Sequence, residues 1–68
     1  MKNNELISVV IPVFNEEKSL KILYEQLQIS LKQYPDYEII FVDDGSSDNS
    51  FSVIEKIAQN DKNIIGIR

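Results

Sequence analysis

Short runs of apolar residues alternate along this chain with longer segments in which apolar positions recur every three or four residues. Two runs, Leu6 to Val13 and Tyr37 to Val42, are typical of buried strands, and a third begins near Asn63. The segments from about Glu16 to Gln33 and from Phe51 to about Gln59 carry an apolar stripe at helical spacing. The pattern therefore predicts the order strand, helix, strand, helix, strand.

The first apolar run also predicts how its strand sits in a sheet. The run is almost unbroken, as in central parallel strands that are covered on both faces. Proline cannot donate a hydrogen bond to a neighbouring strand. We therefore expect pairing on the side of the proline nitrogen to stop near Ile11, just before Pro12, and the chain to turn out through Val13 and Phe14.

Polar residues before each helical stripe predict where the helices begin. Asn15 is placed to cap the first helix, with Glu16 and Glu17 in its first turn, where the helix dipole favours negative charge. Ser47 or Asp48 is placed to cap the second helix. Compensation of the helix dipole is by itself a sufficient reason for the positions of the two glutamates.

Strand-helix-strand units cross over with one handedness, which makes their strands parallel. The chain is therefore predicted to be α/β, with a parallel three-stranded sheet flanked by helices, which is half of a doubly wound nucleotide-binding sheet. With 68 residues and 43% hydrophobic content, it is at most one small unit. Arg68 follows Ile67 with no turn signal, so we expect a fragment of a longer protein.

Composition excludes several classes of function for this chain. The formal net charge is −4 and the 7 Lys and Arg residues are scattered, which argues against nucleic-acid binding. Cysteine and histidine are absent, which excludes thiolate chemistry, Cys/His metal sites and imidazole bases. Met1–Glu5 is too polar for a signal peptide, and no apolar run approaches the roughly 20 residues of a membrane span. We therefore expect a cytoplasmic location.

Two polar loops, Pro12–Glu17 and Asp43–Asp48, follow the first two predicted strands. The carboxyl ends of neighbouring parallel strands point the same way, so both loops should line one rim, where such sheets bind ligands. A carboxylate such as Asp43 can accept the ring N–H of uracil or guanine, and the Phe14 ring can pack on a base. Asp43 and Asp44 could instead hold Mg²⁺ or Mn²⁺, but we prefer base recognition for Asp43.

Simpler explanations exist for the same residues. An Asp-Gly-Ser cluster is also a common solvated turn, and Phe14 can serve as a hydrophobic staple onto the helix. The sequence contains neither Gly-x-Gly-x-x-Gly after the first strand nor Gly-x-x-x-x-Gly-Lys-Ser/Thr, so a glycine-rich phosphate loop is not supported. A bound diphosphate would then need a metal ion or helix N-termini to balance its charge.

The two loops together resemble the family 2 glycosyltransferases, whose nucleotide-sugar-binding domain has the GT-A fold. The resemblance rests on Val9-Val10-Ile11-Pro12-Val13-Phe14-Asn15-Glu16-Glu17 and on Glu38-Ile39-Ile40-Phe41-Val42-Asp43-Asp44-Gly45-Ser46-Ser47-Asp48-Asn49-Ser50, at a matching separation. It covers nearly the whole chain. Within the family, the chain looks most like the polyprenyl-phosphate branch, similar to dolichol-phosphate mannosyltransferases and bacterial undecaprenyl-phosphate glycosyltransferases.

The resemblance implies that five residues bind the donor nucleotide. Pro12, Phe14 and Glu16 would lie against the nucleoside, and Asp43 would hold the base. Asp44 would order the turn or reach the ribose. Phe14 stands where members often have Tyr, which keeps a ring for packing but loses a hydroxyl. Residues 1–68 would then form the N-terminal nucleotide-binding part of the catalytic domain, the βαβαβ half of the Rossmann-like GT-A fold, with no catalytic residue in this chain.

The resemblance also implies a reaction for the whole enzyme, the inverting transfer of a sugar from a UDP- or GDP-sugar to an acceptor such as a polyprenyl phosphate. Members bind Mg²⁺ or Mn²⁺ through a second acidic motif that this sequence lacks, so the metal ligands are expected outside this chain. The enzyme would act at the cytoplasmic face of the membrane, in the synthesis of a cell-envelope polysaccharide or glycolipid.

Two other classes remain open. A non-catalytic α/β binding module could form a homo-oligomer through an exposed sheet edge. A receiver-like domain would use its acidic cluster for magnesium, but the acidic pair of such domains usually follows the first strand. Here that strand ends in Pro-Val-Phe-Asn.

Overall fold

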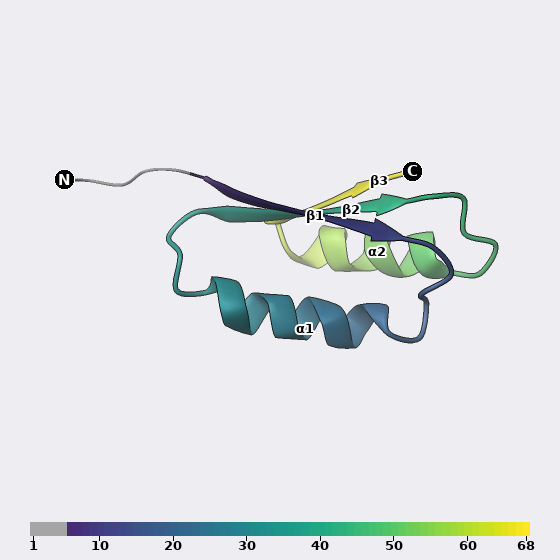
Figure 1. Ribbon diagram of the computed structural model, residues 1–68, viewed down its shortest axis with the longest axis horizontal. Coiled ribbons are helices and arrows are strands. Elements are labelled where there is room, and N and C mark those ends of the chain that lie inside the picture. The colour runs from purple at the N-terminus through teal and green to yellow at the C-terminus, as the bar shows by residue number, and fades with distance from the viewer. Residues whose placement is uncertain (1–5) are drawn as a thin grey trace.

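The order of elements is the one that the apolar pattern predicts. The computed structural model describes residues 6–68, which form β1 (Ile7–Val13), α1 (Leu20–Leu31), β2 (Tyr37–Asp43), α2 (Ser50–Asn60) and β3 (Ile64–Ile67). The strands pair in parallel (Figure 1). The predicted α/β fold, a βαβαβ unit with a parallel three-stranded sheet, is confirmed. Met1–Glu5, which is too polar for a signal peptide, lies outside the described residues.

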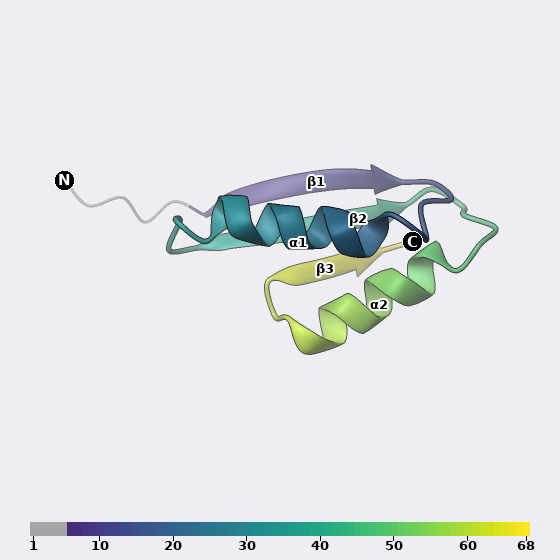
Figure 2. The same ribbon diagram turned by 90° about the horizontal axis from the view of Figure 1, so that it is seen from below.

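The strand order is β1-β2-β3, so β2 is central and β1 lies at an edge among the described residues. Both helices pack against the same face of the sheet (Figure 1, Figure 2). The prediction of a central first strand covered on both faces is therefore wrong. Burial alternates along β1, where Val9 and Ile11 are half-buried against the core and Val10 is exposed on the outer face. An unbroken apolar run does not reveal which strands pair, because the partner strands lie far along the chain.

Pairing of β1 with β2 continues past Pro12, so the expectation that the chain turns out at Val13 is wrong. The register runs on to the pair of Val13 and Asp43. The Val13 carbonyl accepts the Asp44 N–H at 2.9 Å, so the backbone of Val13 faces β2. Backbone groups of successive residues point to opposite sides of a strand, so the nitrogen of Pro12 faces the free edge. Its missing N–H therefore removes no bond to β2.

The core lies between the sheet and the two helices. Every element contributes to its buried side chains, which are Val13, Leu20, Leu31, Ile39, Phe41, Ile54 and Ile64. Alternate residues of a strand share a face, so Ile39, Phe41 and Asp43 of β2 all point toward the helices. Asp43 is thus the last residue in a column of side chains that is otherwise apolar. Its carboxylate lies at the edge of the sheet where the strands end.

α1 begins later than predicted. Its first residue is Leu20, and Ser19 at the N-cap position makes no side-chain capping hydrogen bond. Glu16 and Glu17 precede the helix in a turn, in which the Glu16 carbonyl accepts the N–H groups of Ser19 at 3.0 Å and Leu20 at 3.1 Å. The predictions that Asn15 caps this helix and that both glutamates lie in its first turn are therefore wrong. The Asn15 side chain instead binds the loop after β2.

α2 begins at Ser50, with Asn49 at the N-cap position and no capping hydrogen bond from the Asn49 side chain. The predicted cap position, Ser47 or Asp48, is therefore wrong by at least one residue. Asp48 Oδ1 nevertheless accepts the N–H of Ser50, the first helical residue, at 2.9 Å. The Asp48 carboxylate therefore accepts a helix N–H that lacks a partner within the helix, although Asp48 lies one residue before the N-cap position.

β3 approaches α2 closely at Gly66. A Cβ atom at this position would lie 2.6 Å from Cγ2 of Ile54 and 3.7 Å from the Phe51 ring. Ile54 is fully buried and cannot move aside without disturbing the core. Glycine thus lets β3 lie against the helix, and this approach carries Arg68, two residues on, to the end of β2 where Asp43 lies.

A hydrogen bond ties α1 to the segment after α2. The Tyr24 hydroxyl donates to Asp61 Oδ2 at 2.6 Å. Burial, and then the hydrogen bond and charge of Asp61, raise the pKa of Tyr24 to about 12. The fold therefore stabilises the neutral phenol.

We expect Asp61→Asn to bring the pKa of Tyr24 back toward its ordinary value of 10.0, because the substitution removes the neighbouring charge. With the raised folded-state pKa, the contribution of Tyr24 to stability is complete below pH 10 and is lost as the pH rises through about 12. Ultraviolet absorbance of tyrosinate during an alkaline titration measures the pKa, and Tyr24→Phe identifies the Tyr24 signal. An unchanged Tyr24 titration in the asparagine variant would show that the bond is absent in solution.

Candidate functional site

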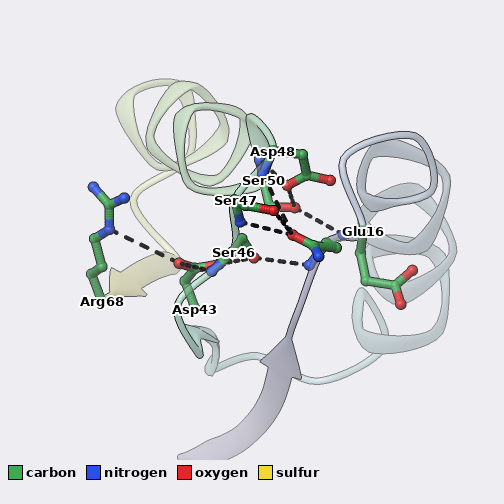
Figure 3. A network of polar contacts seen from close by, with 8 residues as sticks. Glu16, Asp43, Ser46, Ser47, Asp48, Ser50 and Arg68 are labelled. Atoms are coloured by element: carbon green, nitrogen blue, oxygen red, sulfur yellow. Dashed lines mark hydrogen bonds and ion pairs between the residues drawn. The ribbon is translucent and has the colours of Figure 1, made fainter.

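The loops that follow β1 and β2 lie side by side at the carboxyl ends of these strands (Figure 1). The first loop comprises residues 14–19 and the second loop comprises residues 44–49. Hydrogen bonds between side chains and backbone join the two loops directly, as Figure 3 shows from close by. The two loops therefore form one rim of the sheet, as the sequence predicts.

Three successive backbone N–H groups of the first loop donate to side chains of the second loop and of Ser50, the first residue of α2. The pairs are Asn15 with Ser46 Oγ at 2.9 Å, Glu16 with Ser50 Oγ at 2.8 Å and Glu17 with Asp48 Oδ2 at 3.3 Å. These N–H groups lie after the sheet and before the helix, where regular secondary structure offers them no partner. Side chains from the second loop and from Ser50 take that place.

The second loop is held in the same way by side chains of the first. Asn15 Oδ1 accepts the N–H of Ser47 at 2.8 Å and of Asp48 at 3.4 Å, and Glu17 Oε1 accepts the N–H of Asn49 at 3.1 Å. Asn15 has a φ of 51°, in the left-handed region that asparagine enters more readily than most residues. We name the reciprocal bonds between residues 15–17 and 46–50 the loop clamp.

Two buried serines, Ser46 and Ser50, are central to the loop clamp, and the sequence analysis misses both. They are 9% and 0% exposed. Each hydroxyl accepts an N–H of the first loop and donates its proton to a carboxylate, Ser46 to Asp43 and Ser50 to Asp48. Ser50 carries a signal that could have found it, because it lies four residues before Ile54 on the apolar stripe of α2. Ser46 carries none, since serine is equally common in solvated turns.

Asp43 lies beneath the second loop, and Ser46 donates one hydrogen bond to each oxygen of its carboxylate. The residue is 3% exposed, and its Oδ1 accepts the Ser46 hydroxyl while its Oδ2 accepts the Ser46 N–H at 3.2 Å. Arg68 Nε lies 3.9 Å from Oδ2 (Figure 3). The guanidinium carbon of Arg68 lies 5.1 Å from the centre of the Phe51 ring. Each carboxylate oxygen has two lone pairs, so the Ser46 bonds do not use all the acceptor capacity of Asp43. The side chain is 0% exposed, so a ligand reaches these lone pairs only if a covering group such as Arg68 moves aside.

Phe14 and Asp44 are exposed on the same rim. Phe14 is 57% exposed, so its ring can pack on a ligand. The Asp44 N–H binds the Val13 carbonyl and extends the pairing of β1 with β2 by one bond. Gly45 follows with a φ of 77°, which turns the chain over Asp43 into the second loop.

Pro12 and Glu16 lie near Asp43 along the rim, but their side chains point elsewhere. Pro12 pairs with Val42 and is on the outer face of the sheet, whereas Asp43 faces the helices. The Glu16 carboxylate accepts the Ser19 hydroxyl at 2.8 Å and points away from Asp43 (Figure 3). The structure therefore brings the backbone of Glu16 into the loop clamp but does not direct the side chains of Pro12 and Glu16 at the Asp43 carboxylate.

A hollow of about 330 Å³ opens at the rim between the first loop and Asp48. Its lining consists of Asn15, Glu16, Glu17, Lys18, Ser19 and Asp48. A second hollow of about 410 Å³ lies between α1 and α2, lined by side chains that include Tyr24 and Val53. The hollow at the rim is lined by a predicted site residue, Glu16. The hollow between the helices is lined by no residue of the two loops.

The geometry does not favour Asp43 and Asp44 as a metal site. Asp43 is buried under the second loop, whereas Asp44 is exposed. Within residues 6–68, no three His, Cys, Asp or Glu side chains lie together as ligands for a metal ion. Mg²⁺ and Ca²⁺ take six or more oxygen ligands, so a cation at this rim would need ligands from elsewhere.

Comparison with known families matches residues 8–68 to the model described as Glycosyl transferase family 2. The chain belongs to this family. The resemblance that the two loop motifs indicate is thus confirmed, and the loop clamp consists of residues from those two motifs of a family 2 chain.

Three similar proteins carry the name undecaprenyl-phosphate 4-deoxy-4-formamido-L-arabinose transferase. The one from Proteus mirabilis is 52% identical over 63 residues, which cover 90% of this chain and 19% of the relative. The one from Photorhabdus laumondii is 47% identical over 60 residues, which cover 87% of this chain and 18% of the relative. The one from Shewanella sediminis is 41% identical over 68 residues, which cover 97% of this chain and 20% of the relative. The predicted likeness to the polyprenyl-phosphate branch is confirmed, and the chain spans about a fifth of the length of these relatives.

Asp48 lies on the exposed side of the loop clamp. Its Oδ1 accepts the Ser50 hydroxyl at 2.5 Å as well as the Ser50 N–H. The bond from the hydroxyl is the largest influence that holds the pKa of the Asp48 carboxyl below its usual value of 3.8. The charged form of Asp48 is therefore the one that the closed clamp favours.

We expect Ser50→Ala to lower the free energy of unfolding by about 1–3 kcal/mol, because it leaves the part-buried Glu16 N–H without its acceptor. It should also raise the pKa of Asp48 toward 3.8. A depressed folded-state pKa gives stability that is present above the unfolded value and lost as the pH falls through the folded value. The alanine variant should therefore lose less stability than the wild type on acidification.

Urea unfolding at several pH values measures the stability, and carboxyl-carbon NMR measures the titration of Asp48. The matched control is Ser52→Ala, which removes a hydroxyl from an exposed position of the same helix. If Ser50→Ala and the control gave the same stability and the same Asp48 titration, the clamp would not hold in solution.

Proposed function

We propose that this chain supplies the nucleoside-binding part of a glycosyltransferase that transfers a sugar from a nucleoside diphosphate sugar to a polyprenyl phosphate. The observation that carries the proposal is the Asp43 carboxylate, which is buried and held on both oxygens at the carboxyl end of the central strand. Open parallel sheets bind ligands outside this end of their strands. Membership of glycosyl transferase family 2 supports the reaction class.

The base is the part of the donor that Asp43 selects. An ionised carboxylate can only accept hydrogen bonds, so it requires a donor on the base. Uracil and guanine carry a ring N–H at the edge that pairs in duplexes. Cytosine and adenine carry a bare ring nitrogen there, which repels a carboxylate, and can donate only through the neighbouring amino group. Asp43 therefore favours UDP- or GDP-sugars over donors with the other two bases.

The other predicted residues surround the nucleoside in this proposal. The exposed Phe14 ring packs on the base, and Pro12 and Glu16 lie against the nucleoside from the first loop. Asp44 orders the turn or reaches the ribose. Because the Glu16 carboxylate now binds Ser19, contact with a nucleoside requires that side chain to turn.

Residues elsewhere in the enzyme complete the site. We propose that residues 1–68 act as the N-terminal nucleotide-binding part of the catalytic domain and contain no catalytic residue. Mg²⁺ or Mn²⁺, when bound by acidic ligands from outside this chain, neutralises the departing nucleoside diphosphate.

The acceptor is proposed from the relatives, and the location from the family resemblance of the two loop motifs. Their names specify undecaprenyl phosphate, a lipid, as the molecule on which they act. We propose a polyprenyl phosphate as the acceptor here also, with the enzyme at the cytoplasmic face of the membrane. In the part of the chain that the structure describes, no helix has the length and apolar character to cross a bilayer.

Titration of the isotope-labelled chain with UDP, and separately with GDP, tests the donor site by NMR with and without Mg²⁺. We expect amide shifts concentrated at residues 14–17 and 42–46, with a preference for one nucleotide. Asp43→Asn should weaken binding by about tenfold or more, because an amide replaces the charged acceptor. Asp36→Asn, an exposed acid at the opposite end of β2, is the matched control.

CDP provides the decisive comparison for the base. Cytosine lacks the ring N–H, so CDP should bind more weakly than the preferred nucleotide. Equal binding of CDP, or shifts that avoid both loops, would contradict the proposed role of Asp43.

A second candidate, a self-associating binding module, is favoured by the outer face of the sheet. Val10, Ile65 and Ile67 are exposed there, and β1 and β3 are edge strands among the described residues. Exposed apolar surface and unpaired edges favour association with another copy. If this function holds, sedimentation should show a mass that rises with concentration, and a constant monomer mass would exclude it.

A further inference from the structure

Ser46 contacts Asp43 through two separate donors. Its N–H donates to Asp43 Oδ2 at 3.2 Å and its hydroxyl donates to Oδ1, so one residue engages both carboxylate oxygens. Bonds to both oxygens fix the plane of the carboxylate as well as its position. Arg68 Nε, at 3.9 Å, is too far away for a hydrogen bond. Within residues 6–68, the orientation of Asp43 therefore depends on Ser46.

The direction of the Ser46 hydroxyl proton follows from its second partner. The Asn15 N–H donates to Ser46 Oγ at 2.9 Å. A serine hydroxyl has a single proton, so Ser46 donates that proton to Asp43 while its oxygen accepts from Asn15. The donors therefore run in one direction from Asn15 through Ser46 to Asp43, and bonds in such a series strengthen one another.

This series of hydrogen bonds joins the two sides of the base site. Phe14 immediately precedes Asn15, so the bond that holds the Asn15 backbone also determines where the Phe14 side chain starts. Asp43 lies at the other end of the series. The Ser46 hydroxyl thus links the Asp43 carboxylate to the first loop, which carries the Phe14 ring.

We propose that Ser46 is a positioning residue for nucleotide binding, whose hydroxyl holds the Asp43 carboxylate in the orientation that accepts the ring N–H of the base. Ser46 acts through Asp43 and does not itself touch the nucleotide. The inference rests on the proposed function, because it requires Asp43 to bind the base.

The test is the affinity of the 68-residue chain for UDP and GDP, measured by calorimetry for the wild type, Asp43→Ala, Ser46→Ala and the double variant. For the nucleotide that the wild type prefers, the affinity of each single variant should be lower by about tenfold or more. The double variant should bind no more weakly than Asp43→Ala, because Ser46 has no effect without Asp43. Ser52→Ala, exposed on α2, is the control and should bind as the wild type does.

Hydrogen exchange separates positioning from a general loss of structure. In Ser46→Ala, the Asn15 amide should exchange faster, while the Glu16 amide, which binds Ser50, should keep its protection. Ser46→Cys keeps nearly the volume of serine but is a weak donor, so it provides the same comparison if the alanine variant does not fold. Equal loss of protection at both amides would overturn the positioning role, because weaker binding would then follow from an open clamp.

The remaining outcomes distinguish the two proposals. If Asp43→Ala weakens binding but Ser46→Ala and Ser46→Cys do not, the positioning role is overturned and the proposed function stands. Additive losses in the double variant would also overturn it, since Ser46 would then act independently of Asp43. If the wild type binds neither nucleotide, or Asp43→Ala binds as well as the wild type, the proposed function and this inference both fail.

Discussion

Backbone N–H groups in a loop between a strand and a helix have no partners in regular secondary structure. Their need for hydrogen-bond acceptors determines the structure of the rim. In this chain the loops after β1 and β2 turn at the same edge of the sheet, and each supplies side-chain acceptors for the backbone of the other. The bonds between the loops join residues that lie more than 30 positions apart along the chain, so each loop depends on the other for part of its hydrogen bonding. The left-handed backbone of Asn15 is the local cost of this arrangement.

The loop clamp also explains how a buried carboxylate can lie at the end of an apolar column. Ile39, Phe41 and Asp43 share one face of β2, and an isolated charge in the place of a third apolar side chain would be costly. Two donors from Ser46 offset that cost, and the second loop covers Asp43 as it supplies them. The same bonds that make the carboxylate tolerable in the core also restrict it to one orientation. The stability of the rim and the proposed recognition of the base therefore depend on the same few contacts.

Local patterns predicted the elements of this fold but not their partners. The three apolar runs and the two helical stripes were sufficient for the order of elements and for the rim, since both follow from periodicity and the direction of parallel strands. The place of β1 at an edge was not predictable in this way, because strand order depends on pairing between distant segments. Asn15 was misassigned for a related reason: as a cap it competes for local N–H groups, but two N–H groups of the second loop bind it instead. Ser46 could not be distinguished from a turn serine without knowing that Asp43 points into the core.

The nitrogen of Pro12, which faces the free edge of β1, has a consequence for any strand that extends the sheet on that side. Such a strand can accept the N–H groups of Ser8 and Val10, which face the same edge, but it meets no donor at Pro12. The added strand can still donate to the Pro12 carbonyl, which faces the same edge, but it receives no hydrogen bond from Pro12 in return. Proline at this position therefore makes the pairing of any added strand weakest at the carboxyl end of β1, next to the loop clamp.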